Sequence, residues 1–300
     1  MKVRRYGFLR KSWFLVLVGG SVVLSVLLVL RSVFAFSFFK GLSNTLRDSA
    51  WRHSESQLVV PSGEEMTFEA SYLFVKFGSL RFQVVDQVSY DSLPAYHLRA
   101  YIDSYNGIPF VNFHAVYDTY ADTGDLSCIF NLKREREGDS LINTTTSIDS
   151  TRKRFVWMQT ENNRLLKLVD LPYDTNYTNG VSLVYRARQV CQNSGGRKMS
   201  LVVPIIDDTV KSKVELTVNE AREACDVTAF DFPIDSRRLS GRLDFTGTFG
   251  ISGDFVGWMS ADSSIVPLKA KVKVIIGNVV VELKEIKKNN WVPPHAGGSE

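Results

Sequence analysis

The sequence predicts an all-β protein, a large antiparallel meander curled into a barrel-like or half-barrel sheet or a sandwich. One short helix near 181–192 and an N-terminal leader or anchor helix accompany it. Two observations predict this fold. Apolar and polar residues alternate in segment after segment between about residues 65 and 286, and turn-forming residues separate the segments. Such alternation gives each strand one apolar face, as in an antiparallel sheet that covers a core on one side and meets water on the other.

Residues 1–36 have the composition of a signal peptide or a membrane anchor. An uncharged apolar run, 13–30, follows five basic residues: Lys2, Arg4, Arg5, Arg10 and Lys11. The run approaches the roughly 20 residues of a membrane-spanning helix, whereas Val33-Phe34-Ala35 offers a cleavage site. Both interpretations send the remainder across the membrane, because the positive charge stays inside. We expect a periplasmic or otherwise exported protein, held at the inner membrane by 13–30 if the leader is retained.

After a polar connector at 37–62, the first part of a single β domain (63–286) contains eight segments at hairpin spacing. Their separators are turn residues such as Asn106-Gly107, which fits a tight type I′ turn because both residues tolerate positive φ. The connections are too short for crossover helices, so successive strands should pair antiparallel. The expected strands are roughly 65–77, 79–90, 95–105, 110–121, 126–136, 139–148, 153–161 and 163–169.

The middle of the chain interrupts this rhythm. Residues 181–192 have apolar positions at helical spacing, and a glycine-rich run ends them. Gly277-Asn278 is a second candidate hairpin turn, and the tail 287–300, rich in proline and glycine, is expected to be disordered. The remaining strands are expected at about 199–206, 210–218, 226–232, 241–247, 253–260, 265–276 and 279–286.

So many strands must avoid free edges, which is why we expect the sheet to curl or to layer. Charged residues such as Arg99 and Lys271 occupy the non-core faces, which suits water better than lipid. Without the leader's six basic residues the chain has 30 basic and 32 acidic residues, a net charge of −2. Nucleic-acid binding therefore loses its electrostatic basis.

Three cysteines follow the leader. An exported compartment permits a disulfide, and Cys191–Cys225 is the favoured pair. Cys128 alternates with Leu126 and Phe130 and should be a small buried hydrophobe. No C-x-x-C, H-x-H or helical His pair is present, so the sequence indicates no metal site and no cofactor.

Catalytic patterns are weak, and we assign no catalytic residue. The best candidates for a hydrolase are Asp118 or Asp122 with His114, or Ser182 at the start of the helix. No nucleophile elbow or Walker loop occurs. Aromatic residues could instead line an apolar cavity inside a curved sheet. The candidate lining residues are Tyr105, Tyr117, Tyr120, Trp157, Tyr185 and Trp258.

Several local patterns carry a family resemblance. Gly63-Glu64 precedes the first strand, Tyr120-Ala121-Asp122 ends another, and Trp258-Met259-Ser260-Ala261-Asp262 lies ahead of a proline. Over about residues 63–286 the chain resembles the bacterial exported family catalogued as domain of unknown function 3108 (DUF3108). That family often has a second acid where Ala261 stands, so no charge-dependent role is implied for that turn. The matching positions are Gly63, Glu64, Gly78, Asp122, Tyr185, Arg188, Trp258, Asp262 and Pro267.

The resemblance implies an all-β envelope domain without an established activity. With the leader and the weak catalytic patterns, it favours a non-enzymatic periplasmic binding or scaffold protein. Its expected partners are an apolar small molecule or lipid, or envelope proteins. The alternatives are a hydrolase-type envelope enzyme that uses Asp/His or Ser, and a structural partner in envelope assembly.

Overall fold

The structure is a computed structural model that describes residues 58–107, 112–137, 139–149, 151–243, 253–273 and 278–297. All of them belong to one compact unit, residues 52–300. The predicted leader and most of the predicted connector lie outside the described residues. Within those residues, no helix has both the length and the apolar character needed to cross a bilayer.

The described part of the chain forms fourteen strands and one α-helix, joined by turns and loops. The strands before the helix are β1 (Glu65–Tyr72), β2 (Val75–Tyr90), β3 (Leu93–Ser104), β4 (His114–Asp122), β5 (Cys128–Glu137), β6 (Ser140–Asp149), β7 (Arg154–Glu161) and β8 (Arg164–Pro172). After α2 (Gly180–Ser194) come β9 (Met199–Asp207), β10 (Val210–Cys225), β11 (Ile234–Leu243), β12 (Gly253–Ser260), β13 (Pro267–Lys273) and β14 (Asn278–Lys287).

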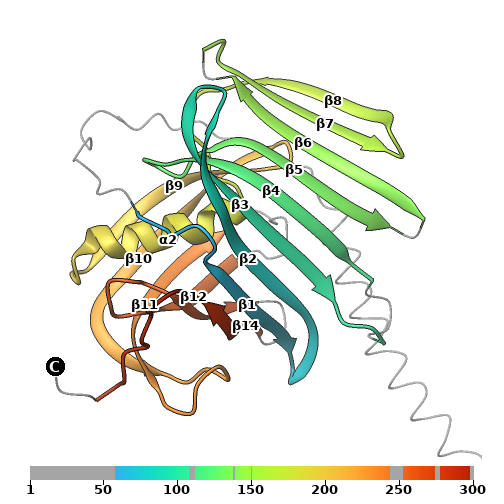
Figure 1. The fold of residues 1–300 in the computed structure, drawn as a ribbon. Coiled ribbons are helices and arrows are strands. Elements are labelled where there is room, and N and C mark those ends of the chain that lie inside the picture. Colours follow the sequence, from blue (N-terminus) through green and yellow to red (C-terminus); the bar gives the residue numbers. More distant parts are fainter. Residues whose placement is uncertain are drawn as a thin grey trace, which may run out of the picture. The chain divides into compact units, whose positions relative to one another are not determined.

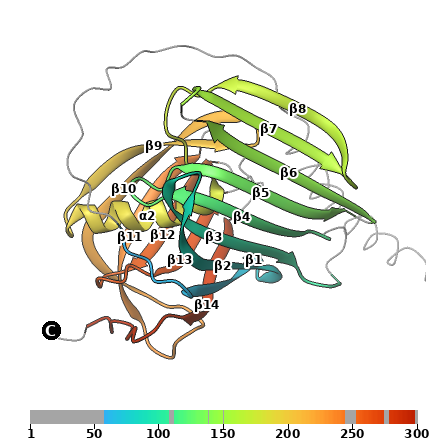
Figure 2. The same ribbon diagram turned by 45° about the horizontal axis from the view of Figure 1, so that its top comes forward.

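These strands form one antiparallel sheet with the order β8-β7-β6-β5-β4-β3-β2-β1-β14-β13-β12-β11-β10-β9 (Figures 1 and 2). Two meanders, β1–β8 and β9–β14, meet where the first strand pairs with the last. In that pairing Phe68 of β1 lies opposite Leu283 of β14, both on the buried face. The predicted all-β antiparallel meander is confirmed.

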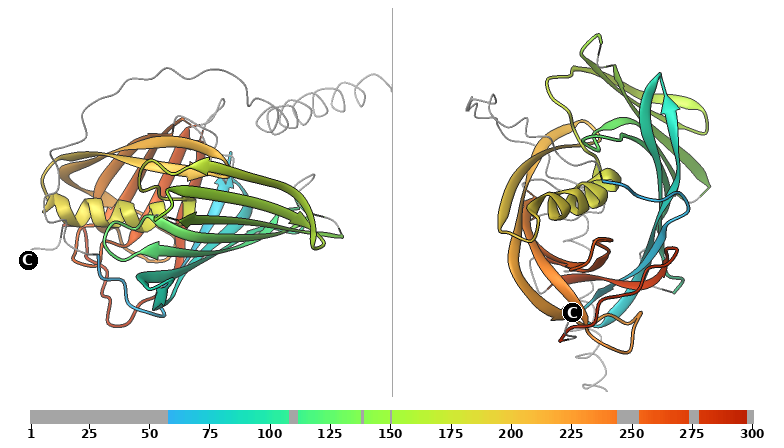
Figure 3. Two further views of the ribbon diagram at one scale, coloured as in Figure 1. Left: turned by 90° about the horizontal axis from the view of Figure 1, so that it is seen from above. Right: turned by 60° about the vertical axis from the view of Figure 1, so that its left-hand side comes forward.

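The sheet curls around α2, and its two limbs lie on opposite sides of the helix (Figure 3). α2 contacts β9 and β10 on one limb and β3 and β4 on the other. In the largest buried cluster, Val181 and Tyr185 of α2 pack with Phe68 and Leu98 of the sheet. The second cluster includes Val190 of α2. A single curled sheet around a helix corresponds to the barrel-like alternative rather than to the sandwich.

The start of α2 is fixed by a reciprocal capping box. The side-chain oxygen of Asn179 accepts a hydrogen bond from the Ser182 N–H at 2.8 Å, and Ser182 Oγ accepts one from the Asn179 N–H at 3.0 Å. Gly195, with a φ of 55°, ends the helix in the left-handed conformation that glycine adopts without strain. The helix is therefore slightly longer than the predicted 181–192.

The first hairpin turns at Leu73-Phe74, not near Gly78 as the sequence suggests. Gly78 lies inside β2 beside β3, where a Cβ atom would stand 2.7 Å from the backbone oxygen of Asp103. The glycine therefore allows two strands to approach closely, while the turn forms five residues earlier. Because both turn residues are apolar, their sequence continues the strand pattern and hides the turn.

The predicted two-residue turn at Asn106-Gly107 is also wrong. β3 ends at Ser104 and β4 begins only at His114, so the connection is longer. Ser104 Oγ accepts a hydrogen bond from the Phe113 N–H at 2.9 Å, which brings the two ends together before the ladder begins. The other predicted turn, at Gly277-Asn278, lies partly outside the described residues.

Two further predictions of local structure fail, and for related reasons. The expected strand at 226–232 is absent, because Phe230 and Phe232 pack on the main core cluster from a non-strand segment. The expected disordered tail is ordered from residue 287 to 297. There Trp291 Nε1 donates to Asp262 at 2.8 Å, and His295 bridges to Ile234. In both segments, apolar side chains from irregular backbone pack on the core, and a search for alternating apolar and polar residues does not find such segments.

The proposed Cys191–Cys225 disulfide is not formed, and all three cysteines are free and buried. Cys191 belongs to the second core cluster, whereas Cys225 belongs to the first. Cys128 is buried, as the alternation predicts, and burial raises the pKa of its thiol to about 12. The thiols therefore behave as small core residues.

Candidate functional site

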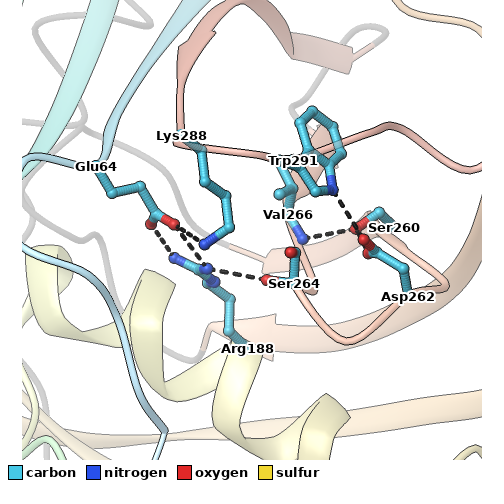
Figure 4. Close-up of polar contacts among 8 residues, drawn as sticks. All are labelled: Glu64, Arg188, Ser260, Asp262, Ser264, Val266, Lys288 and Trp291. Carbon is cyan, nitrogen blue, oxygen red and sulfur yellow. Dashed lines mark hydrogen bonds and ion pairs between the residues drawn. The ribbon is translucent and has the colours of Figure 1, made fainter.

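A buried cluster of ionised side chains connects four distant parts of the chain (Figure 4). Glu64 immediately precedes β1, and its carboxylate accepts hydrogen bonds from Arg188 of α2 at 2.5 and 3.2 Å. Lys288, just after β14, donates to the same carboxylate at 2.5 Å. Arg188 also donates to the backbone oxygen of Ser264 at 2.9 Å. One carboxylate thus ties the beginning and the end of the β domain to the central helix.

The electrostatics of this cluster follow from its burial. Glu64 and Arg188 have side chains that are 0% and 1% exposed. Burial alone raises the pKa of the Glu64 carboxyl, but the charges and hydrogen bonds of Arg188 and Lys288 outweigh it, so the pKa is lowered. The carboxylate is ionised and fully engaged, an arrangement suited to holding strands together rather than to exchanging protons with a substrate.

The turn between β12 and β13 is fixed beside this cluster. Ser260 Oγ donates to Asp262 at 2.5 Å and accepts from the Val266 N–H at 2.7 Å. Trp291 donates to the other oxygen of Asp262, as described above, which attaches the C-terminal segment to the turn (Figure 4). These bonds fix the turn in which the carbonyl oxygen of Ser264 accepts a hydrogen bond from Arg188.

Of the positions with the family pattern, four gather at this point. Glu64, Arg188 and Asp262 lie in or next to the network, and the Tyr185 ring centre is 5.7 Å from the Arg188 guanidinium carbon. The others lie elsewhere. Asp122 accepts from the N–H groups of its own turn, at Gly124 and Asp125. Trp258 donates to Glu223 on the sheet surface, Gly63 forms a turn with a φ of 83°, Gly78 lies against β3 and Pro267 begins β13.

A small polar cavity lies beside the beginning of α2. Its volume is about 30 Å³, room for about one or two water molecules. Tyr117, Lys133, Thr144 and Asp207 are among its lining residues. Burial, reinforced by the neighbouring charge of Asp208, raises the pKa of the Asp207 carboxyl to about 7. The cavity is too small for a drug-sized ligand, which needs several hundred Å³.

The six aromatic residues predicted to line a cavity are not brought together. Tyr117 lines the small polar cavity, and Tyr185 is buried beside Arg188. The remaining four contact separate partners. Tyr105, Trp157 and Trp258 donate hydrogen bonds to Glu69, Asp208 and Glu223 respectively, and Tyr120 stacks on His97.

The hydrolase candidates are likewise engaged in separate structural contacts. His114 bonds Asp103 at 2.8 Å, whereas Asp118 is held by His97 and Arg99, each at 2.7 Å, and by Arg134. Ser182 is fully buried in the capping box of α2. Within the described segments, no group of three His, Cys, Asp or Glu residues is placed to hold a metal ion.

The two edges of the sheet differ strongly. In the described part of the chain β8 pairs with β7 alone, and its residues Leu165, Leu166 and Leu168 are 55%, 45% and 58% exposed. β9, at the other edge, contains Pro204 and is covered by Thr178, which bonds the carbonyl of Pro204 and the N–H of Ile206. The sequence contains only a weak indication that β8 exposes apolar side chains: the adjacent residues Leu165 and Leu166 break the alternation of apolar and polar residues.

The fold and these sites together define a class, namely a barrel-like β domain with a helix in its core. A family model described as "Protein of unknown function (DUF3108)" matches residues 67–284, so the chain belongs to this family, as the sequence resemblance suggested. No curated protein matches significantly.

Comparison with solved structures finds similar proteins of low sequence identity. A β-barrel-like protein of domain of unknown function DUF1849 from Brucella abortus is 8% identical, with a TM-score of 0.48 over 75% of this chain and 97% of that chain. A protein from Bacteroides fragilis, described as exported and with a YmcC-like fold, is 10% identical, with a TM-score of 0.31 over 77% and 99%. A protein from Parabacteroides distasonis, described as a lipoprotein, is 10% identical, with a TM-score of 0.29 over 76% and 96%.

Proposed function

We propose that the protein is an exported binding or scaffold domain that holds an extended polypeptide segment along the free edge of β8. The observation that carries this proposal is the contrast between the two edges of one sheet. A free edge offers a row of unpaired N–H and C=O groups, and proteins normally blunt it with proline, charge or a covering segment. β9 has such protection in Pro204 and Thr178. β8 has no proline before Pro172, its last residue, and no covering segment among the described residues, and Lys167 is the one charge in the middle of the strand.

The side chains of β8 indicate what kind of segment would fit. Leu168 lies opposite Met158 of β7, and both are exposed on the outer face of the sheet. Exposed leucines on an edge strand favour a partner strand with apolar residues at alternate positions, which would add main-chain hydrogen bonds and cover them. Arg164 and Asp170, near the ends of the strand, already pair with Glu161 and Arg154 of β7 at 3.1 and 2.5 Å, so recognition would rest mainly on the leucines.

The interior supports a surface role rather than an internal apolar ligand. α2 and its buried ion cluster fill the space between the two limbs of the sheet. The described cavity at the start of α2 holds about one or two waters and is polar. A partner protein of the cell envelope is therefore the proposed occupant, in preference to a lipid carried inside the sheet.

A peptide titration on the full chain tests the proposal. The probe is a fluorescent synthetic peptide of alternating leucine and threonine, followed by polarisation and by amide hydrogen exchange. We expect saturable binding that protects the amides of β8. Leu165→Lys with Leu168→Lys should weaken binding at least tenfold, since burying one leucine contributes about 1.5–3 kcal/mol and 1.4 kcal/mol is tenfold in affinity.

The matched control places two lysines near the protected edge, Val202→Lys with Val210→Lys, where the valines are 50% and 47% exposed. It should leave binding unchanged. Equal loss in both double variants, or peptide binding that leaves the β8 amides exchanging freely, would contradict the proposal. A stable dimer that protects the same amides in the absence of peptide would also contradict it, because the occupant would then be a second copy of the chain.

A further inference from the structure

The tip of the β1–β2 hairpin exposes apolar side chains at a turn that is itself unfavourable. Leu73 and Val75 are more than half exposed, and Phe74 is completely exposed. Leu73 and Phe74 both have positive φ, 46° and 69°. Among non-glycine residues, asparagine and aspartate adopt that conformation most readily, and leucine and phenylalanine rarely do. Backbone strain combined with exposed apolar surface is a recognised mark of a functional segment.

The same chain shows what an ordinary turn of this kind contains. Two other two-residue hairpin loops have the same pair of positive φ angles: Asp91-Ser92 (48° and 66°) between β2 and β3, and Asn162-Asn163 (47° and 67°) between β7 and β8. Both consist of polar residues that face water, and three of the four are aspartate or asparagine, which tolerate the left-handed region. Leu73 and Phe74 differ from these residues in two ways: they disfavour positive φ, and they are apolar although they are exposed. Formation of the turn therefore does not explain why these two residues are present.

Lysines surround the hairpin with an excess of positive charge. Lys76, close to the tip, pairs with Glu69 at 2.6 Å, whereas Lys284 contacts the same carboxylate at 3.6 Å from beside Phe68, about 20 Å along the strand from the tip. Lys271 and Lys273 on the outer face of β13 are exposed and have no carboxylate partner among the described residues, although Lys271 also lies over the Trp258 ring. β13 is two strands from β1 in the sheet order, about 10 Å away at the usual strand spacing.

We propose that this hairpin is a membrane-contact site, in which Leu73 and Phe74 enter the interface of an anionic lipid bilayer while Lys76, Lys271 and Lys273 lie near its headgroups. A lipid surface fits better than a protein partner, because a stable protein interface buries about 800 Å² on each side and a two-residue tip supplies far less. Isolated protruding apolar side chains with basic neighbours are what a bilayer interface accepts.

The buried thiols make a selective experiment possible on the full chain. Because Cys128, Cys191 and Cys225 are buried, an exposed cysteine can be labelled alone with the environment-sensitive dye NBD. Phe74→Cys reports on the hairpin. Ser92→Cys, in the matched polar turn at the opposite end of β2, is the control. Any attachment through the N-terminal leader is common to both labelled chains, so the difference between the two positions reports on the hairpin alone.

We expect NBD at position 74 to shift to the blue and brighten on vesicles of phosphatidylcholine with phosphatidylglycerol, and to do so less on phosphatidylcholine alone. NBD at position 92 should remain in water on both. Lys271→Gln with Lys273→Gln should weaken the response at position 74 by about fivefold per lysine. Unchanged emission at position 74 on anionic vesicles, or an equal shift at position 92, would overturn the proposal.

A second variant separates membrane contact from a role in folding. Leu73→Asn with Phe74→Gly introduces the sequence that type I′ turns favour. If the apolar pair serves the membrane, this variant should have an equal or higher Tm and should lose vesicle binding at the hairpin, measured with a dye at Val75→Cys. A clearly lower Tm would mean that Leu73 and Phe74 support the fold, and would overturn the proposal.

Discussion

Neutralising Glu64 should destabilise the whole β domain, because it is the single carboxylate in a buried cluster with two cations. In Glu64→Gln the shape of the side chain is kept, but Arg188 loses its ionic partner while its side chain is 1% exposed. Lys288, with an 11% exposed side chain, loses the same partner. The variant therefore leaves positive charge buried without compensation.

The expected loss is about 3–5 kcal/mol in the free energy of unfolding, the usual result of removing one partner from a buried ion pair. Domains have total stabilities of about 5–15 kcal/mol, so the variant should remain folded only marginally. The adjacent Glu65 is a matched control, since its partner Lys287 is 64% exposed. Glu65→Gln removes a surface pair, which contributes about 1 kcal/mol or less.

Urea denaturation of the full chain, followed by circular dichroism, measures both losses. With a slope of about 3 kcal/mol per molar, the Glu64→Gln midpoint should fall by about 1 M or more. Arg188→Met combined with Glu64→Met should cost less than the two single changes together, because the fully buried Arg188 charge is removed with its partner and only Lys288 is left without a carboxylate. A loss under about 1 kcal/mol in Glu64→Gln, or strict additivity in the double variant, would refute the reasoning.

The pH dependence has a defined sign. The folded-state pKa of Glu64 is lowered, so its contribution is complete above the unfolded-state pKa of about 4.5 and is lost as the pH falls through the folded-state value. Glu64→Gln lacks this contribution at every pH. The difference in stability between wild type and variant should therefore be larger at about pH 7 than at about pH 3.

Three further outcomes follow from the structure. Gly241→Ala should lower stability by about 1–3 kcal/mol, because its Cβ would stand 2.5 Å from the Glu215 backbone oxygen, whereas Gly257→Ala, with its nearest atom at 3.7 Å, should be tolerated; equal Tm values would contradict this. Asp207→Asn should raise the Tm at about pH 8 but not at about pH 4, since a carboxyl whose folded pKa is raised to about 7 loses stability as the pH rises between the two pKa values. The three cysteines should resist a thiol reagent in the native protein and react completely in denaturant, and reaction of any one without unfolding would show that its burial is wrong.

The elements that sequence predicted well are those whose pattern reflects one buried and one solvated face. In β5, for example, alternation from Cys128 onward placed the strand within two residues of its observed bounds, because a shift by one residue would turn every apolar side chain outward. The apolar positions at helical spacing and the run that ends at Gly195-Gly196 likewise predicted α2, whereas its capping residue Asn179 was recognised only in the structure. Local sequence patterns predict an element correctly when its burial follows the periodicity of its own backbone, as it does in β5 and α2.

The candidate sites were harder to predict because they depend on relations between distant residues. Glu64 and Arg188 lie 124 positions apart, and no local pattern indicates that a curled sheet brings them together; only the family resemblance marked both positions. The free edge of β8 is a property of sheet order, which alternation does not determine. Leu73-Phe74 was hidden for the opposite reason, since its apolar residues imitate a strand where the chain in fact turns.

The two proposed surfaces are far enough apart to be tested independently and to act together. β8 is six strands from β2 in the sheet order, about 29 Å along the sheet at the usual spacing. Substitutions at that separation are normally additive, so Leu165→Lys with Leu168→Lys should not change the lipid response of a probe at position 74. A domain with a lipid-contacting hairpin and a distant strand edge could hold an extended partner beside a bilayer. Coupling between the two readouts would instead indicate that one surface is an indirect effect of the other.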